Sequence, residues 1–511
     1  MSVLTVPAPI KALDRAIADL YWEYAGGHHE KHRLIVPSLA ELAEWHQRIE
    51  RRQHQVNEAA LPPFWHRHFT GLLDSLAVQL ELDQARPHSF IYRLTRALEH
   101  LTLVDDRSAK ERASLVEAKL ERSHQLLGEV RLRLTDRSQL TRREAIAAVR
   151  ILKWNVREVR ATLASYGTQL MQQQLTNLRI ACDWFIQALG DLGPPAKEAP
   201  LDYRSLLSKG YQLDWNEILS WYLDEWRCVR EKLAKLAASV DPWRSFPAVW
   251  DQAFPSYDSP ESLVAAMEAC LVRARHHASA WVHLPPGERC TVDLMSATAK
   301  RSFTWATYDG TGDPLTGQVM LNADRLSRLN QGWLQVLAVH YGYPGLHAHR
   351  VKTAASRLPY TFRCGHLAAE VLVKGMAQRS ERLMQSSVAP KAYAALVQYR
   401  RLVSITGIGV EHFLSSGKND WQEIKDVYRE QMGFDESASQ AQARSHLMRP
   451  GREMCHYCGL RELEQLQAKL GWDDARFTEE CLGWGFVSMN TLGDLLFMSE
   501  EERAQVRNFV T

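Results

Sequence analysis

The stretch Val339-His340-Tyr341-Gly342-Tyr343-Pro344-Gly345-Leu346-His347-Ala348-His349 places a histidine at a helix end beside a rigid turn. Upstream of it, apolar residues recur at spacings of three and four, which marks one face of a helix. These residues are Leu326, Leu329, Trp333, Val336 and Leu337, and His340 continues the series. The glycines and the proline that follow interrupt such a helix. The sequence therefore predicts a helix that ends near His340.

A histidine in this setting is typical of metallopeptidase helices. In those helices two histidines one turn apart bind zinc, and a glutamate next to the first activates water. Here the residue after His340 is Tyr341, and the position one turn further on is Pro344. Neither residue can perform the corresponding task, so the ordinary zinc-hydrolase motif is not present.

The stretch nevertheless resembles the signature of the domain-of-unknown-function 885 family, a zincin-like group with the pattern H-E-x-x-P-G-H. His340, Tyr343, Pro344 and Gly345 match it, whereas Tyr341 replaces the family glutamate and Leu346 replaces the second histidine. The resemblance implies a mainly α fold: a zincin-like helical protein with a small β-hairpin or sheet beside the central cleft.

A second family element, E-G-[WIL]-A, contains a glutamate that looks like the third metal ligand. Lys374-Gly375-Met376-Ala377 aligns with it, so that the ligand position holds Lys374. An ammonium group offers a dication no lone pair, and we therefore expect no metal and no other cofactor. A shifted alignment would use Glu370 instead. Zinc then stays an alternative, held by His340 and Glu370 with the nearby histidines His347, His349 or His366.

Each residue at the altered positions has two interpretations. Lys374, if buried, would have a lowered pKa and could act as a base or as a carbonyl-attacking amine; if exposed, it would only pair with Glu370. Tyr341 could donate a proton in the cleft or fill space as a core aromatic residue. His340 could be a base, a hydrogen-bond donor to substrate, or a buried histidine with its bonds satisfied.

Near the C-terminus, residues 449 to 459 resemble the family's P-G-Q-A-x-x-Y-x-x-G element. His456 occupies the position of the family tyrosine, with Tyr457 beside it, so transition-state hydrogen bonding could be supplied differently. Cys455 and Cys458 form a C-x-x-C pair, which is weak evidence for zinc or redox chemistry without a second pair. Earlier, Ile405 and Gly409 replace an aspartate and a histidine that flank T-G in the family.

The resemblance thus implies two sets of site residues. We expect a catalytic set of His340, Tyr341, Lys374 and His456, and a substrate-binding set of His347, Arg363, Glu370 and Tyr457.

Composition bounds the partners of the chain. Its 62 basic and 60 acidic residues give a formal charge of +2 and are interspersed, so we expect neither nucleic acid nor an anionic membrane as a partner. Met1 to Pro9 lacks the pattern of a secretion signal, no apolar run reaches about 20 residues, and eight scattered cysteines suit reduced thiols. We therefore expect a cytoplasmic protein.

The order of predicted elements indicates a helical region over residues 1–193 and a zincin-like region that carries the cleft over 194–511, closely packed together. Gly190 to Pro195 is the clearest linker. Helical periodicity covers Ala12 to Tyr24, Ser38 to Val56, Pro63 to Gln79, Ser89 to Leu103, Asp106 to Leu134, Thr141 to Leu189, Asn216 to Ala237 and Ser259 to Ala278. A β-hairpin is expected across Asp309 to Gly317. The cluster His28, His29 and His32 suits a loop better than a metal site.

Two classes of function remain. One is a zinc-independent hydrolase- or lyase-type enzyme that acts by acid–base chemistry on a small amino-acid-like or peptide-like substrate. The other is a non-catalytic descendant of the fold that binds a ligand or a partner. A zinc peptidase with unusual ligands is a third alternative. The oligomeric state is not predicted by any pattern in the chain.

Overall fold

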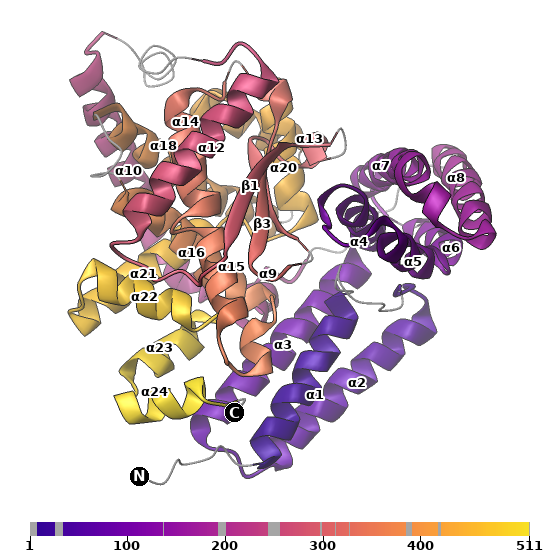
Figure 1. Ribbon diagram of the computed structural model, residues 1–511, viewed down its shortest axis with the longest axis horizontal. Coiled ribbons are helices and arrows are strands. Elements are labelled where there is room, and N and C mark those ends of the chain that lie inside the picture. The colour runs from indigo at the N-terminus through magenta and orange to yellow at the C-terminus, as the bar shows by residue number, and fades with distance from the viewer. Residues whose placement is uncertain are drawn as a thin grey trace. The chain divides into compact units, whose positions relative to one another are not determined.

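The computed structural model describes residues 8–25, 34–135, 137–192, 201–243, 256–296, 299–311, 313–326, 328–384, 391–416 and 421–509. Helices dominate these ranges, and a single small sheet accompanies them (Figure 1). The expectation of a mainly α protein with a small sheet is confirmed. The chain divides into two compact units. The predicted boundary between residues 193 and 194 and the cluster of His28, His29 and His32 lie outside the described residues.

The unit formed by Ala12–Pro62 and Leu72–Leu201, here called the N-terminal unit, has helices as its secondary-structure elements within its described residues. Its elements are α1 (Ala8–Ala25), α2 (Leu39–Glu58), the second part of α3 (Pro63–Ala85), α4 (Ser89–Glu99), the π-helical turn η1 (His100–Val104), α5 (Ala109–Leu120), α6 (Ser123–Leu134), α7 (Gln139–Leu163), η2 (Ala164–Tyr166) and α8 (Gln169–Gly190). The side chain of Ser38 accepts a hydrogen bond from the Glu41 amide, which confirms the predicted start of α2.

Two predicted long helices of this unit are each broken in two. The helix expected over Asp106 to Leu134 divides at Arg122, whose guanidinium binds the carboxylate of Glu41 at 2.7 Å and the carbonyl of Leu34 at 3.1 Å. The helix expected over Thr141 to Leu189 divides at η2, after which Thr168 caps α8. At the first break a long-range contact, and at the second a helix cap, replaces helical continuation, and periodicity alone detects neither.

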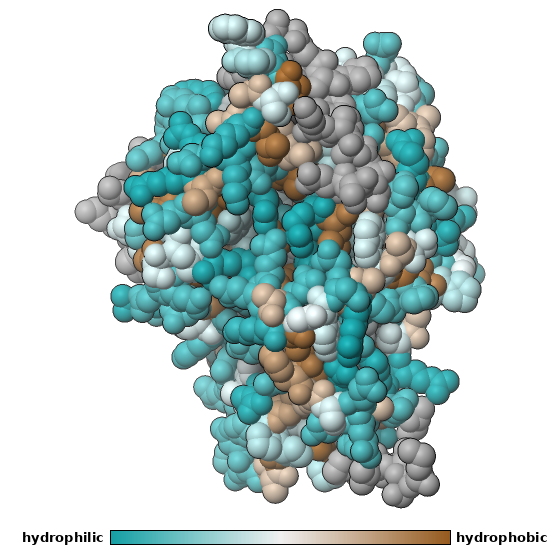
Figure 2. Space-filling view, turned by 90° about the vertical axis from the view of Figure 1, so that its left-hand side faces the viewer, coloured by the Kyte–Doolittle hydropathy of each residue, from teal (hydrophilic) through white to brown (hydrophobic). Residues whose placement is uncertain are grey.

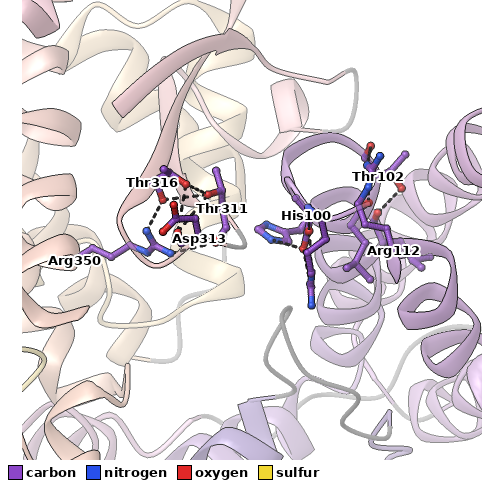
Figure 3. A network of polar contacts seen from close by, with 11 residues as sticks. His100, Thr102, Arg112, Thr311, Asp313, Thr316 and Arg350 are labelled. Atoms are coloured by element: carbon purple, nitrogen blue, oxygen red, sulfur yellow. Dashed lines mark hydrogen bonds and ion pairs between the residues drawn. The ribbon is translucent and has the colours of Figure 1, made fainter. Parts of the chain in front are cut away.

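Polar side chains also hold the π-helical turn at the end of α4. Arg112 of α5 donates hydrogen bonds to the carbonyls of Leu101, at 3.2 Å, and Thr102, at 3.0 Å (Figure 3). Carbonyl groups at a helix end have no partner within the helix, so an arginine from the next helix satisfies them.

The remaining unit, here called the C-terminal unit, comprises Met1–Lys11, Pro63–Gly71 and Asp202–Thr511. Its further elements are α9 (Tyr203–Ser205), η3 (Leu206–Tyr211), α10 (Trp215–Val240), α12 (Pro260–Ala278), β1 (Arg289–Leu294), α13 (Ala299–Ser302), β2 (Ala306–Gly310), β3 (Thr316–Leu321), η4 (Ala323–Arg325), α14 (Gln331–Leu337), η5 (Ala338–Gly342), α15 (Leu346–Ala355), η6 (Tyr360–Arg363), α16 (Leu367–Leu383), α18 (Lys391–Ser415), α19 (Trp421–Asp426), η7 (Val427–Gln431), α20 (Glu436–Met448), α21 (Cys455–Leu470), α22 (Asp474–Gly483), α23 (Met489–Phe497) and α24 (Glu500–Arg507). In the part of the chain that the structure describes, we found no helix whose length and apolar character would let it traverse a lipid bilayer.

The sheet has the order β1-β3-β2, with β1 parallel and β2 antiparallel to β3. The predicted hairpin is confirmed as β2 and β3. The strand β1 was missed, since a six-residue strand gives only a short alternation of side chains. Arg350 of α15 secures the hairpin turn by donating to the carbonyls of Thr316, at 2.6 Å, and Thr311, at 3.3 Å (Figure 3).

The predicted helix that leads to His340 starts later than expected, and it ends at Gly342, where the sequence predicted an interruption. Asn330 caps α14, so Leu326 and Leu329 precede the helix. After Leu337 the backbone widens into the π-helical turn η5, which carries His340 and ends at Gly342. Gly345 then passes directly over the carbonyl oxygens of Val339 and His340, where a side chain would overlap them. The turn therefore holds His340 in place through backbone contact.

Helices α16 and α21 cross at a pair of glycines. A methyl group on Gly375 would overlap the backbone of Gly459, and one on Gly459 would overlap the carbonyl oxygen of Val371. The two helices are adjacent in Figure 1. Because neither residue has a side chain, the two backbones make direct contact, which brings Lys374 of α16 close to the start of α21.

We expect Gly459→Ala to lower the free energy of unfolding by about 2 kcal/mol, because the added methyl group forces the two backbones apart. Chemical denaturation would measure this loss. The control is Gly493→Ala in α23, where an added methyl group meets no atom within 4 Å. That change should be neutral or stabilise by up to about 1 kcal/mol. Equal effects at both positions would show that the crossing is not tight.

Candidate acid–base site

Four elements of the C-terminal unit contribute to one polar cluster. The turn η5 supplies His340 and Tyr341, α16 supplies Glu370, Lys374 and Glu381, and α18 supplies Arg400. The start of α21 supplies His456, and the residues just before it are Arg452 and Glu453. His340 and Glu381 are buried, whereas Tyr341, Lys374 and His456 are half-buried. The cluster therefore keeps part of its surface exposed at these three residues.

A carboxylate fixes the orientation and the tautomer of His340. Its Nδ1 lies 2.8 Å from Oε1 of Glu381, and Arg400 Nε donates to the same oxygen at 2.8 Å. Since that oxygen is an acceptor, we assign the imidazole proton to Nδ1. Arg400 Nη2 also lies 3.2 Å from Nδ1. The lone pair then resides on Nε2, which has no hydrogen-bond partner within the described ranges. This arrangement suits a general base.

Both imidazoles of the cluster are neutral at pH 7. Burial lowers the pKa of His340 well below its ordinary value, and the positive charges of Arg400 and Lys374 add to the effect. His456 stacks on His340 with ring centroids 5.6 Å apart. Burial, followed by the charge of Lys374, lowers the pKa of His456 to about 3.

The ammonium group of Lys374 has no direct partner among the described residues. It makes no hydrogen bond or ion pair with any residue that the structure describes. Burial and the charge of Arg452 lower the pKa of Lys374 to about 8, and the carboxylates of Glu370 and Glu453 act in the opposite direction. The amine is thus mostly protonated at pH 7 and can still exchange its proton near neutrality.

Glu370 and Tyr341 make defined contacts at the edge of the cluster. Burial acts to raise the pKa of Glu370, but Arg452 and Lys374 outweigh it and lower that pKa to about 2. Glu370 Oε2 lies 3.4 Å from Arg452 Nε. The phenol of Tyr341 donates to the carbonyl of Ala306 at 2.9 Å, so its proton is already engaged with the start of β2.

Three of the expected substrate-binding residues lie elsewhere in the C-terminal unit. His347 Nε2 is 2.8 Å from Glu288, a buried carboxylate that also accepts from Tyr343 at 2.6 Å. Arg363 donates to the carbonyl of Ser356 at 2.7 Å. Tyr457 donates to Glu225 of α10 at 2.8 Å. Only Glu370 of the expected substrate-binding set belongs to the polar cluster.

Sequence reasoning missed the partners that orient the cluster. Glu381 lies seven residues after Lys374, two turns further along the same helix, so helical spacing could have identified it. Arg400 comes from a distant helix and had no local signal. Beneath the cluster, His446 bonds Glu411 at 2.6 Å and Tyr428 at 2.7 Å, and this buried triad was also not anticipated.

The residues of the cluster do not fit a zinc site. Within the described ranges, no three histidine, cysteine, aspartate or glutamate side chains converge as a metal-binding group. The nearby cations Lys374 and Arg400 disfavour a further positive charge beside His340. Cys455 and Cys458 are buried, and burial raises the pKa of both thiols well above the ordinary value.

Comparison with known proteins places the chain in a family. Residues 21–496 match the model of the family described as "Bacterial protein of unknown function (DUF885)". The chain belongs to this family. A search of curated proteins found no match.

Two solved structures share the fold of this DUF885 protein. One is described as a "putative lipoprotein" from Colwellia psychrerythraea and is 13% identical, with a TM-score of 0.76 over 96% of this chain and 99% of that chain. The other, a "putative lipoprotein of unknown function" from Shewanella oneidensis, is 14% identical, with a TM-score of 0.71 over 96% and 100%. At these identities the likeness concerns the fold alone.

We expect Lys374→Met to raise the free energy of unfolding at pH 7 by roughly 2 kcal/mol, as measured by denaturant titration. The folded pKa of about 8 lies below the value near 10.4 of an unfolded lysine, so the unfolded chain binds more protons between these limits. The cost of the charged amine is therefore complete below pH 8 and is relieved as the pH rises towards 10. The gain from the methionine should shrink over that interval.

The control for this change is Lys352→Met. Lys352 pairs directly with Glu479, so its removal should not stabilise the protein. A Lys374→Met protein that is less stable than the unmodified protein at pH 7 would contradict an ammonium without a direct partner.

Proposed function

We propose that this DUF885 protein is a zinc-independent, hydrolase- or lyase-type enzyme that acts on a small amino-acid-like or peptide-like substrate. We further propose that its cleft derives from a zincin-like scaffold in which the metal ligands were replaced. One observation carries the proposal. His340 has its Nδ1 held by a buried carboxylate and its Nε2 without a partner among the described residues, next to a lysine whose pKa is about 8.

The residues of the cluster divide into a base and an acid. Nε2 of His340 removes a proton, either from water or from a carbon next to a carbonyl group. The Lys374 ammonium stabilises the negative charge that develops on the carbonyl oxygen, or protonates the leaving group. Glu381 stabilises the imidazolium that forms on His340, because their contact places a negative charge at Nδ1.

The charge of the cluster favours an anionic group on the substrate. Arg400 and Arg452 lie close enough to perturb the pKa values of the site residues, and their positive charges would attract a carboxylate. In a small substrate with an amino-acid carboxylate and a carbonyl group, the carboxylate would pair with the arginines and the carbonyl group would lie beside the base. The stacked ring of His456 would form a wall beside it.

The test is turnover of a panel of amino-acid amides, short peptides and cyclic peptides by chelator-treated protein. We expect activity to survive chelation and to fall above about pH 8, where Lys374 loses its proton. His340→Gln should lower kcat/KM by about 10²-fold or more. Lys374→Arg should move the falling limb to higher pH, because a guanidinium stays protonated.

The matched control is His412→Gln, since His412 is an exposed histidine of α18. It should leave kcat/KM unchanged. Activity that disappears with a chelator and returns with zinc would favour the zinc-dependent alternative. A panel without turnover, together with binding of a panel compound that His340→Gln abolishes, would favour a non-catalytic descendant of the fold.

A further inference from the structure

A concave site lies between α10, α18 and the α19–η7 segment of the C-terminal unit. It is a cavity of about 250 Å³, open on one side. Its walls include Trp226 from α10, Ile405 and Phe413 from α18, and Val427 from η7. Figure 2 shows the side of the molecule on which α10 lies in Figure 1, where apolar residues appear in brown between hydrophilic ones. None of the residues that line the cavity belongs to the acid–base cluster.

The indole N–H in the wall of this cavity already has a hydrogen-bond partner within the wall. Trp226 Nε1 donates to Thr406 Oγ1 at 3.0 Å, so the indole donor of one wall is satisfied by the hydroxyl of another. Ile405 and Ile424 are among the lining residues, and the surface that the cavity exposes is mainly apolar. A charged group placed there would lose its hydration without a compensating bond. The buried part of an occupant must therefore be uncharged and apolar.

The size of the cavity limits the occupant further. An enclosed apolar cavity of about 150 Å³ accepts benzene, and pockets for larger ligands start near 300 Å³. A volume of about 250 Å³ thus suits two fused rings or an acyl chain of about eight to ten carbons. Aromatic side chains in the walls, from Tyr222, Trp226 and Phe413, favour a ring through stacking. The exposed carboxylate of Glu423 at the rim disfavours an anion.

We infer that the α10–α18 cavity is a binding site for an uncharged, apolar small molecule of about the size of naphthalene. The site is separate from the acid–base cluster, because α18 directs different residues to each. Arg400 and Ser404 contact Glu381 and Gln378 of α16, whereas Ile405 and Gly409 line the cavity.

Gly409 provides a precise way to close the site. A methyl group built there meets only Tyr222 Cε2, at 3.8 Å, so a longer side chain can extend into the cavity without overlapping the backbone. Gly409→Leu therefore fills the proposed site and does not touch the acid–base cluster. Gly493→Leu in α23 is the matched control, because that glycine also has open space around it and lies outside the cavity.

The experiment is a fluorescence titration of the full chain with N-phenyl-1-naphthylamine, an uncharged probe whose naphthalene ring would fill the cavity and whose phenyl group would extend through the open side. We expect saturable binding of one probe per chain to the unmodified protein and to Gly493→Leu, and binding at least tenfold weaker to Gly409→Leu. The anionic analogue 1-anilinonaphthalene-8-sulfonate should bind more weakly than the uncharged probe. Val427→Phe fills the same cavity from the opposite wall and serves if Gly409→Leu does not fold.

Three results would overturn the inference: no saturable binding by the unmodified protein, equal affinity of Gly409→Leu and Gly493→Leu, or tighter binding of the anionic probe. Because the readout is binding of a probe and not turnover, failure here leaves the proposed acid–base function standing. Failure of that function likewise leaves this site intact.

Discussion

The contact between two helix backbones at Gly375 and Gly459 determines the geometry of the polar cluster. With no side chain between them, α16 and α21 approach until backbone meets backbone. Lys374 precedes one of these glycines, and His456 lies three residues before the other. The crossing therefore brings an amine and an imidazole together. The π-helical turn then adds His340, which stacks on His456.

Electrostatics sets the protonation states of these groups when they are brought together. Burial alone would make both imidazoles neutral, and the cations on α16 and α18 reinforce that state. The carboxylate of Glu381 is fully buried and its pKa is raised by burial, against the charge of Arg400. The result is a neutral imidazole, an ammonium group and an orienting carboxylate in one cluster.

Local signals in the sequence predicted the helices, the Ser38 cap and the β2–β3 hairpin. The resemblance to a family predicted that His340, Lys374 and His456 lie close together. Breaks in long helices were not predicted, because the contact of Arg122 with Glu41 joins residues 81 positions apart. Arg400 escaped notice for the same reason: its partner Glu381 comes from another helix, and no spacing rule connects them.

Helix α18 touches both the polar cluster and the apolar cavity, on different faces of one rod. Such an arrangement links the two sites thermodynamically whenever occupancy of one shifts the helix. The coupling must then be reciprocal. If a ligand in the cavity strengthens the ion pair between Arg400 and Glu381, formation of that ion pair raises the affinity for the ligand by the same factor. A single helix would thus couple an apolar ligand in the cavity to the polar cluster without direct contact between them.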